Sequence, residues 1–333
     1  MDAGLRLLIA ALLDIIFGDP RFIPHPVRIL GAYIKFCENR IRKIFPKHEF
    51  ISGAITGIST VIIGYGMVFF SIKIAGMIGK YAAQIVEILW IYLAISAGDL
   101  DKSVMNVLNA LKKGDIKSAR KKLSLIVGRD TENLDSPEIS RAAVETTAES
   151  LVDGIISPLF FLLLGGAPLM WAFKAASTCD SMIGYNDEKY KFFGRFSARF
   201  DDLLNFIPAR LSIPIIFISS MLLRILFCPI RPINCLKICL RDMRKHASPN
   251  AGIPEAAFAG ALAVRLGGLN YYSGERHCLP IMGEEGVPAS ICDISNALKL
   301  MWTSSLIFIA ALFIFYKISK HGSILSLILA QVG

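Results

Sequence analysis

Long apolar runs alternate with polar, basic segments along the 333 residues of this chain. A helix needs roughly 20 apolar residues to cross the hydrocarbon of a bilayer. Residues 3–17 are a short candidate, and 155–173 are another that Gly165, Gly166 and Pro168 interrupt. Four further runs approach the required length: 51–72, 82–98, 206–227 and 300–316. The pattern predicts an all-α, polytopic integral membrane protein with about four to six membrane-embedded helices.

The composition supports the same class of protein. Hydrophobic residues make up 54% of the chain and the mean hydropathy is +0.54, whereas soluble proteins are typically about 45–50% apolar. The run 3–17 contains Asp14 and is followed by no small-residue cleavage site, so we expect an uncleaved helix rather than a signal peptide. Without an internal repeat or a low-complexity linker, we expect one membrane-embedded domain over 1–333.

The net charge of +9 is compatible with two classes of partner. A nucleic-acid-binding protein would gather Lys and Arg on one face with aromatic residues. Here the basic residues follow the ends of apolar runs, as the positive-inside rule expects. We therefore expect the lipid bilayer, and no nucleic acid, as a partner. The seven cysteines show no zinc-ligand spacing.

The basic loops predict which side of the membrane each segment faces. Lys and Arg are frequent in three polar segments: 18–50 with seven, 99–154 with nine and 228–299 with eight. This bias places them in the cytoplasm and the N-terminus outside. Segment 174–205 lies outside if 155–173 and 206–227 both cross, but joins the cytoplasmic loops if both enter and return. The broken run favours the second arrangement, so we predict a multi-pass protein of the cell membrane with large cytoplasmic loops.

Residues 141–153 read RAAVETTAESLVD and carry Glu145, Glu149 and Asp153 four residues apart. On an α-helix this spacing forms one drifting stripe of carboxylates. A solvated helix face is one interpretation, but only Arg141–Glu145 provides an oppositely charged pair at this spacing. The other interpretation, which we favour, is a Mg²⁺ site, because one or two carboxylates and substrate phosphate oxygens commonly hold this ion.

The preceding segment VGRDTENLD, 127–135, adds candidate ligands. Arg129 is a planar fork suited to phosphate or carboxylate, and Asp130 can ligate or cap, although a plain loop fits the pattern equally well. The chain has no GxxxxGK[ST] loop, so ATP, if used, is held in another way. Cap-type residues predict a helix start just downstream: Asp135 or Ser136 as N-cap, Pro137 in the first turn and Glu138 behind it.

A second polar region follows the interrupted run. Lys174 and Asp180 share a polar helix face, and Arg195 and Arg199 come soon after. These side chains suit a cation or a phosphate. The alternative is an amphipathic interfacial segment whose aromatic residues lie among lipid headgroups: Phe192, Phe193 and Phe196.

Three other features are candidates for function. His25 lies among prolines between Arg21 and Arg28, although a lone His is more often structural than catalytic. Asp14 lies inside an apolar run, where burial costs about 3 kcal/mol, so it is expected to have a partner or a function. Residues 248–275 mix small residues with Gly pairs and Tyr271, which suits a large flat ligand or tight helix packing.

Together these motifs resemble the CbiB/CobD family, the adenosylcobinamide(-phosphate) synthases of cobalamin biosynthesis. They occur in the family's order between residue 14 and about residue 275. Two details differ from the common pattern, at Ser150 and at Ser177–Met182, but the carboxylates are retained. The matching stretches are GDPRFIPHPVR, VGRDTENLDSPEISRAAVETTAESLVDGIISPLFFLLLGGAP, TCDSMIGYNDEKYKFFGRFSARFDDLLNFIPARL and SPNAGIPEAAFAGALAVRLGGLNYYSGE.

The resemblance implies a membrane ligase that joins a carboxylate of adenosylcobyric acid to (R)-1-amino-2-propanol or its O-phosphate, using ATP and Mg²⁺. Other late membrane enzymes of the pathway are candidate partners. An acyl phosphate is the simplest activated intermediate, and cations must then neutralise the phosphoryl charge. The roles that we expect on this basis are catalytic for Arg129, Arg141, Lys174 and His25, cofactor-binding for Asp130, Arg195, Arg199, Asn270 and Tyr271, and metal-binding for Glu145, Glu149, Asp153 and Asp180.

Two other classes of function fit parts of the pattern. A polytopic transporter or channel would use Asp14, Glu145, Glu149 and Asp153 as an ion path. The charges, however, gather in loops and helix entries rather than along several spans. A non-catalytic membrane sensor on the same scaffold would be expected to lose the motifs in 127–153 and 174–210, and both are present.

Overall fold

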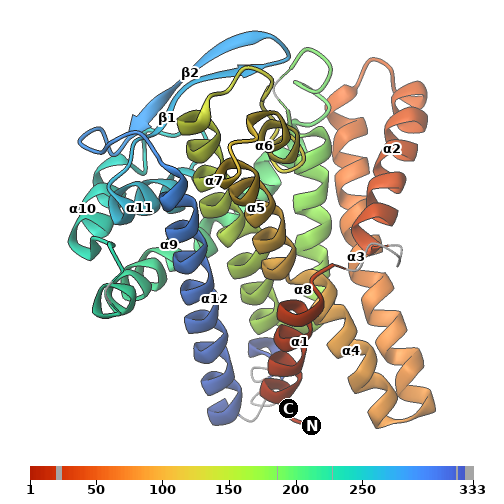
Figure 1. The fold of residues 1–333 in the computed structure, drawn as a ribbon. Coiled ribbons are helices and arrows are strands. Elements are labelled where there is room, and N and C mark those ends of the chain that lie inside the picture. Colours follow the sequence, from red (N-terminus) through yellow and green to blue (C-terminus); the bar gives the residue numbers. More distant parts are fainter. Residues whose placement is uncertain (20–24, 186, 227, 320–321, 327–333) are drawn as a thin grey trace. The chain divides into compact units, whose positions relative to one another are not determined.

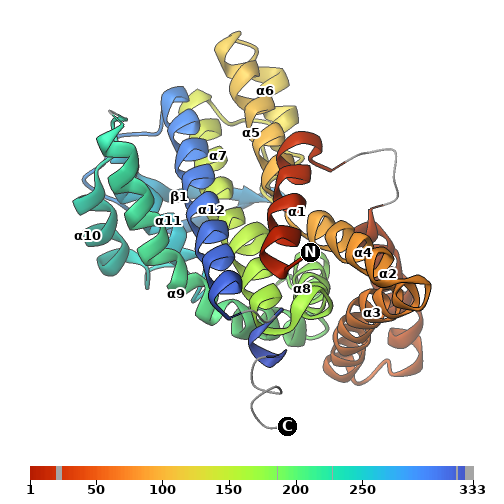
Figure 2. The same cartoon turned by 90° about the horizontal axis from the view of Figure 1, so that it is seen from below.

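The computed structural model describes residues 1–19, 25–185, 187–226, 228–319 and 322–326. Arg21 of the N-terminal motif and most of the apolar tail lie outside these residues. The structure is 74% helical, and Figures 1 and 2 show its elements. These are α1 (Ala3–Phe17), α2 (Pro26–Ile44), α3 (Glu49–Ile78), α4 (Lys80–Ala94), α5 (Ala97–Lys112), α6 (Ile116–Leu123), α7 (Ser136–Leu151), the π-helix η1 (Val152–Ile156), α8 (Ser157–Ile183), α9 (Arg195–Ile225), α10 (Pro232–Asp242), α11 (Gly252–Leu262), β1 (Leu266–Tyr272), β2 (Glu275–Met282) and α12 (Ile291–Ser319).

Five helical stretches in the described part of the chain are long and apolar enough to cross a membrane. They overlap all four long apolar runs and the interrupted run 155–173, so the predicted class of a polytopic, helical membrane protein is confirmed. The helix α1 has only 15 residues and is too short to be among them. The five stretches are Glu49–Ile78, Lys80–Lys112, Ser136–Ile183, Arg195–Ile225 and Ile291–Ser326.

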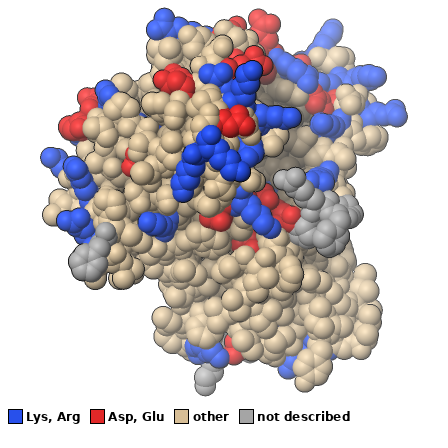
Figure 3. Space-filling view, in the orientation of Figure 1, with Lys and Arg blue, Asp and Glu red and all other residues tan. Residues whose placement is uncertain are grey.

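The helix α3 shows how such a segment suits lipid. Its outer surface exposes large apolar side chains, among them Ile62 (64%), Phe70 (60%) and Ile74 (59%). Two of its buried hydroxyls are satisfied within the helix, since Thr56 Oγ1 donates to the Ser52 carbonyl at 2.9 Å and Thr60 Oγ1 to the Thr56 carbonyl at 2.7 Å. In Figure 3 Lys and Arg gather over α6, whereas the lower parts of α3 and α4 carry few charges. A contiguous apolar surface of this kind is expected of a helix facing hydrocarbon.

The chain forms two compact units. One comprises Met1–Ser96, Ser157–Asn205 and Ile309–Gly333, and the other comprises Ala97–Ile156 and Phe206–Phe308. In the first, which we call unit 1, α3 packs against α2, α4 and α8, and α4 also contacts α1. In the second, unit 2, α7 packs against α5, α6 and α11, and α11 also contacts α10 and both strands. A single domain over 1–333 stays a prediction.

Two apolar runs are less regular than a continuous helix. The interruption expected in 155–173 is observed, because Gly165 and Gly166 have non-helical dihedrals and kink α8. The run 82–98 is two helices rather than one, since α4 ends at Ala94 and α5 begins at Ala97. Whether 155–173 crosses the membrane or re-enters stays a prediction.

A two-stranded antiparallel sheet is the main element that the sequence did not predict. Tyr272 of β1 pairs with Glu275 of β2, which leaves a two-residue loop of Ser273 (φ 51°) and Gly274 (φ 83°). Positive φ at both central positions is the signature of a type I′ hairpin turn. The segment 248–275 therefore contains one helix, α11, and a strand, rather than helices alone.

The far end of this hairpin is anchored on α10. Asp242 is completely buried and accepts the Gly283 backbone N–H at 2.9 Å. It also pairs with Arg241 at 2.7 Å and with Lys245 at 3.1 Å. Burial alone would raise the pKa of Asp242, but these donors hold its pKa below the ordinary value. The ionised carboxylate thus fixes where β2 ends.

Candidate functional site

The carboxylate stripe begins on α7, whose start has the predicted geometry. Asp135 is the N-cap and forms a capping box with Glu138, with Pro at the first positions of the helix. One side of α7 is buried against α5, α6 and α11 of the same unit, and Thr146 Oγ1 donates to the Ile126 carbonyl at 3.1 Å. That contact holds the end of the segment leading to Arg129, so the two sequence motifs are brought together.

Glu145 lies at the centre of a buried group of charges. Its side chain is only 4% exposed, and its Oε2 lies 2.6 Å from Arg129 Nη2. Its Oε1 lies 3.4 Å from Arg141 Nη1, the pair predicted from the four-residue spacing, and accepts the Gly267 N–H at 2.7 Å. Two guanidinium groups therefore face one carboxylate, so the three side chains Arg129, Glu145 and Arg141 together carry a net positive charge.

Asn270 joins the two arginines on the side of the hairpin. Its Oδ1 accepts a hydrogen bond from Arg129 Nη1 at 2.9 Å and one from Arg141 Nη2 at 3.0 Å. The side chain is 1% exposed, and its Nδ2 has no hydrogen-bond partner among the described residues. A buried donor without a partner is costly, so the Asn270 amide is suited to meet an acceptor from a bound molecule or water.

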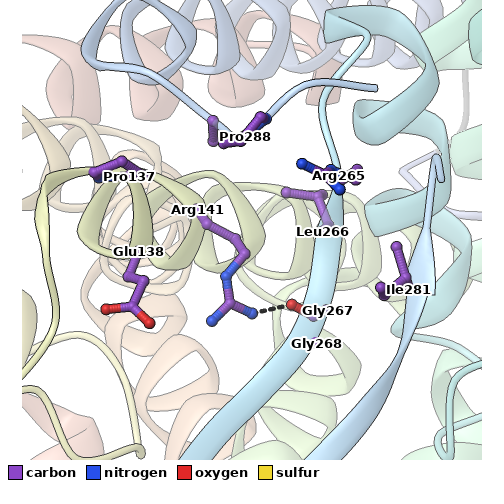
Figure 4. A pocket seen from close by; sticks show the side chains of 10 residues that line it. Pro137, Glu138, Arg141, Arg265, Leu266, Gly267, Gly268, Ile281 and Pro288 are labelled. Atoms are coloured by element: carbon purple, nitrogen blue, oxygen red, sulfur yellow. Dashed lines mark hydrogen bonds between the residues drawn. The ribbon is translucent and has the colours of Figure 1, made fainter. Parts of the chain in front are cut away.

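Arg141 also holds β1 in place. Its guanidinium donates to the Gly267 carbonyl, a contact seen in Figure 4, and to the Leu269 carbonyl at 2.9 Å. Protein groups thus occupy most of its donors. The pocket in Figure 4 has Arg141, Leu266, Pro288 and Ile281 in its lining. The geometry gives Arg141 a positioning role, and its predicted phosphate contact stays a prediction.

Asp130 connects the loop after Arg129 to the hairpin turn. Its carboxylate accepts the Gly274 N–H at 2.7 Å and the Ser273 N–H at 3.2 Å, and its own N–H donates to the Tyr271 carbonyl at 2.8 Å. Arg129, Asp130 and Tyr271, all predicted as site residues, therefore line one cavity of about 1070 Å³.

Two acid–base residues beside this group were missed by the sequence analysis. Glu255 of α11 is 7% exposed, and His246 Nε2 lies 3.9 Å from its Oε1. Burial raises the pKa of Glu255 well above its ordinary value, and the negative charges of Glu145 and Glu149 add to this effect. A single carboxylate inside the small-residue run PEAAFAGALA was the available signal, because an isolated buried acid is rarely kept without a partner.

The carboxylates are not arranged as a cluster that surrounds a metal ion. Among the residues that the structure describes, no group of three or more His, Cys, Asp or Glu could hold one, and Glu145 is already held by Arg129 and Arg141. Mg²⁺ bound mainly through phosphate oxygens needs only one or two carboxylates. Exposed Glu149, one turn after Glu145, and partly exposed Asp153 in η1 fit that second mode. A metal role for Glu145, Glu149 or Asp153 stays a prediction.

The remaining predicted residues belong to unit 1. His25 is the N-cap of α2: its Nδ1 accepts the Val27 N–H at 3.3 Å, and its Nε2 lies 3.1 Å from the Leu93 carbonyl. Burial lowers the pKa of His25; Asp19 opposes this effect, and the nearby charge of Lys174 adds to it. Lys174 Nζ donates to Ser96 Oγ at 2.8 Å. The structure thus gives His25 a capping function and brings it near Lys174, whereas catalysis by either residue stays a prediction.

Arg195 and Arg199 line another cavity of unit 1, of about 370 Å³, together with Lys191 and Phe192. Phe192 is 54% exposed, as an interfacial segment would require. Phe193 is instead fully buried and packs with Ile34, Cys179 and Ile183, so the alternative that places it among lipid headgroups is wrong for this residue. Asp180, near the end of α8, is partly exposed, and its predicted metal role is untested.

Comparison with known proteins identifies the family. The family described as CobD/Cbib protein matches residues 7–301. A cobalamin biosynthesis protein CobD of Clostridium perfringens is 47% identical over 290 residues, which cover 87% of this chain and 90% of that protein. A CobD of Klebsiella pneumoniae is 42% identical over 299 residues, covering 89% and 92%. A CbiB of Salmonella typhimurium is 42% identical over 306 residues, covering 91% and 94%.

No solved structure matches the chain, so the arrangement described above has no experimental counterpart among them. The matched residues include all of unit 2 up to Met301, and with it Arg129, Glu145, Glu255 and Asn270. The identities extend over most of each relative rather than over one motif. This chain therefore belongs to the CobD/CbiB family of cobalamin biosynthesis proteins.

Proposed function

We propose that this protein is an ATP-dependent amide ligase of cobalamin biosynthesis. It joins a propionate carboxylate of adenosylcobyric acid to the amine of (R)-1-amino-2-propanol or its O-phosphate. Membership of the CobD/CbiB family supports the pathway. The observation that carries the reaction is the buried Arg129–Glu145–Arg141 group with Asn270, because it places fixed cations beside a large cavity where phosphate and carboxylate would meet.

The reaction needs an activated carboxylate, since a free carboxylate is a poor acyl donor. In the proposed sequence a corrinoid carboxylate oxygen attacks the γ-phosphorus of ATP, and ADP leaves. The amine nitrogen then attacks the acyl carbon and loses a proton, forming the amide bond and releasing inorganic phosphate. The guanidinium of Arg129, held by Glu145 and Asn270, would bind the transferred phosphoryl group without reorganising.

Mg²⁺ would supply charge neutralisation on the phosphates, and Glu149 and Asp153 are the residues that would hold it. Arg141 keeps β1 at its place and thereby keeps Asn270 between the two arginines. We further propose that the polar loops of unit 2 face the cytoplasm, where ATP is available, in agreement with their Lys and Arg content.

The nucleotide products and a trapping reaction test the activation step. An acyl phosphate gives ADP and phosphate, whereas an acyl adenylate gives AMP and pyrophosphate. With hydroxylamine in place of the amine, the proposal predicts a corrinoid hydroxamate and one ADP for each hydroxamate. Formation of AMP would overturn the acyl-phosphate step. Absence of any carboxylate-dependent ATP cleavage in protein that inserts normally would overturn the ligase itself.

A further inference from the structure

A polar cavity of unit 2 lies beside the buried group of Arg129, Glu145 and Arg141 and has a basic wall. It is bounded by α6, by the loop 129–134 and by the hairpin turn, and its volume is about 1070 Å³. Small-molecule sites usually measure about 300–1000 Å³, so this cavity has room for a whole nucleotide. Figure 3 shows Lys and Arg gathered over α6, which forms one side of it.

Three cations of α6 line the cavity: Lys117, Arg120 and Lys121. Arg120 and Lys121 follow Lys117 by three and four residues, so the three side chains share one face of α6, which Asp115 caps. Arg120 Nε donates to the Leu134 carbonyl at 2.8 Å, which fixes α6 to the loop. Neither Lys117 nor Lys121 belongs to any of the ion pairs found within the described residues, so both ammonium groups are available to an anion.

Three carboxylates, Asp130, Glu132 and Glu138, line the same cavity against four cations, so they compensate the positive charge only in part. Asp130 is bound to the N–H groups of the hairpin turn. Glu138 accepts the Asp135 N–H at 2.8 Å in the capping box. Arg129 adds a guanidinium at the inner side of the cavity, and Tyr271, which is 42% exposed, adds an aromatic face.

We infer that this cavity is the nucleoside triphosphate site, with Lys117 and Lys121 binding the polyphosphate and Tyr271 lying against the base. The inference rests on the proposed ATP-dependent function. Lys ammonium groups bind phosphate as point charges, and Arg129 can contact the phosphoryl group to be transferred. Aromatic faces stack on purines. The sequence contains no P-loop, and this basic wall supplies the cation that a P-loop lysine would otherwise provide.

Phosphate could also reach the cavity on the phosphorylated amine. That ligand has a single phosphate and no ring, so it would leave most of 1070 Å³ empty and Tyr271 without a partner. A nucleotide would instead fill the volume, place its phosphates against the cations of α6 and lay its base against Tyr271. We therefore assign the cavity to the nucleotide and let the experiment distinguish the two phosphate carriers.

The test compares two double variants of the full-length protein in detergent. Lys117→Gln/Lys121→Gln removes both free ammonium groups from the cavity. The matched control, Lys113→Gln/Lys122→Gln, removes the same charge from neighbouring positions that do not line it. Binding of a fluorescent ATP analogue is titrated directly, with displacement by ATP, ADP, AMP and the phosphorylated amine. The KM values for ATP, adenosylcobyric acid and each amine are measured in parallel.

We expect at least tenfold weaker nucleotide binding and a KM for ATP raised at least tenfold in Lys117→Gln/Lys121→Gln. The KM for the corrinoid and the amine should change less than twofold, and the control should match the wild type. Displacement should follow the order ATP, ADP, AMP. An unchanged KM for ATP, or a rise only in the KM for the phosphorylated amine, overturns the assignment.

Failure of the proposed function gives a different result. If the wild type makes no amide but binds ATP in a way that depends on Lys117 and Lys121, the nucleotide-site assignment is retained and the ligase proposal is rejected. If amide forms normally in both double variants at limiting ATP, the ligase proposal is retained and the nucleotide-site assignment is rejected. If the wild type neither binds the ATP analogue nor forms amide, both the nucleotide-site assignment and the ligase proposal are rejected.

Discussion

Arg129 Nη2 lies 2.6 Å from Glu145 Oε2, and the two side chains are only 11% and 4% exposed. Burial lowers the pKa of Arg129, but the charge of Glu145 and its hydrogen bond outweigh that effect, so the pKa stands above its ordinary value. Arg129 is therefore a permanent cation whose position is fixed from behind by a carboxylate. Removing one partner of such a buried pair typically costs about 3–5 kcal/mol, because the other charge is left uncompensated.

Arg129→Lys tests whether the planar fork matters and not only the charge. A lysine can pair with Glu145 but cannot also donate to Asn270 Oδ1 in the same geometry. We expect turnover to fall at least tenfold while the protein still inserts and remains folded. Arg276→Lys, on the exposed surface of β2, is the matched control and should be fully active. Near-normal turnover in Arg129→Ala would remove this residue from the site.

Glu149→Gln and Asp153→Asn test the metal assignment, because each is nearly isosteric and changes charge alone. If these carboxylates hold Mg²⁺ with phosphate, each change should lower turnover at least tenfold, or about 1.4 kcal/mol in transition-state stabilisation. Raised Mg²⁺ should recover part of the loss. If these carboxylates only form a solvated helix face, activity should stay intact and stability should be equal or slightly higher, because repulsion between the carboxylates is relieved. Turnover across a Mg²⁺ titration separates these outcomes, and full activity at limiting Mg²⁺ in both variants excludes the metal role.

Gly267→Ala and Gly268→Ala form a matched pair that tests the anchoring of β1. Both residues have positive φ, 82° and 88°, so an alanine strains the backbone at either position by about 1–2 kcal/mol. A Cβ on Gly267 would also overlap the Pro280 carbonyl, whereas a Cβ on Gly268 meets nothing within 4 Å. Gly267 additionally donates to Glu145. We expect thermal stability in detergent, and turnover, to fall clearly more in Gly267→Ala; equal effects would show that this contact is unimportant.

Single-cysteine labelling on a Cys-free background tests the predicted topology. Probes at Lys113 and Lys191 should react only from the cytoplasmic side, because the polar loops are predicted to lie there. A probe at Met77, which is 78% exposed near the end of α3, should react only from outside. Labelling of the Lys191 position from outside would show that 155–173 and 206–227 cross the membrane instead of returning.

Local features of the fold were predictable because short-range rules govern them. The cap at Asp135, the Arg141–Glu145 pair and the kink at Gly165 follow from residue type and spacing over a few positions. The apolar runs likewise predicted the membrane helices, since their length has to match the bilayer. These features were enough to predict the class of the protein and the part of the site that lies on α7.

The features that depend on long-range packing were not predictable. The contact of Glu145 with the Gly267 N–H joins residues 122 positions apart, and neither the hairpin nor Glu255 has a local signal strong enough to identify it. Ser273–Gly274 is a recognisable turn pair, but Gly267 and Gly268 in β1 and Pro280 in β2 weaken the strand signal on its two sides. As a result the stripe Glu145–Glu149–Asp153 suggested carboxylates free for metal, whereas Glu145 is held by two arginines.

Direct detection of the amide product shows whether this protein is a ligase. The purified protein in detergent is incubated with adenosylcobyric acid, Mg²⁺-ATP and either (R)-1-amino-2-propanol or its O-phosphate, and the corrinoid products are identified by mass spectrometry. An ATP-dependent amide ligase gives a product whose mass equals that of the corrinoid plus the amine minus one water, formed only when ATP is present. An unchanged corrinoid with both amines, from protein that is folded and inserted, would contradict the ligase proposal.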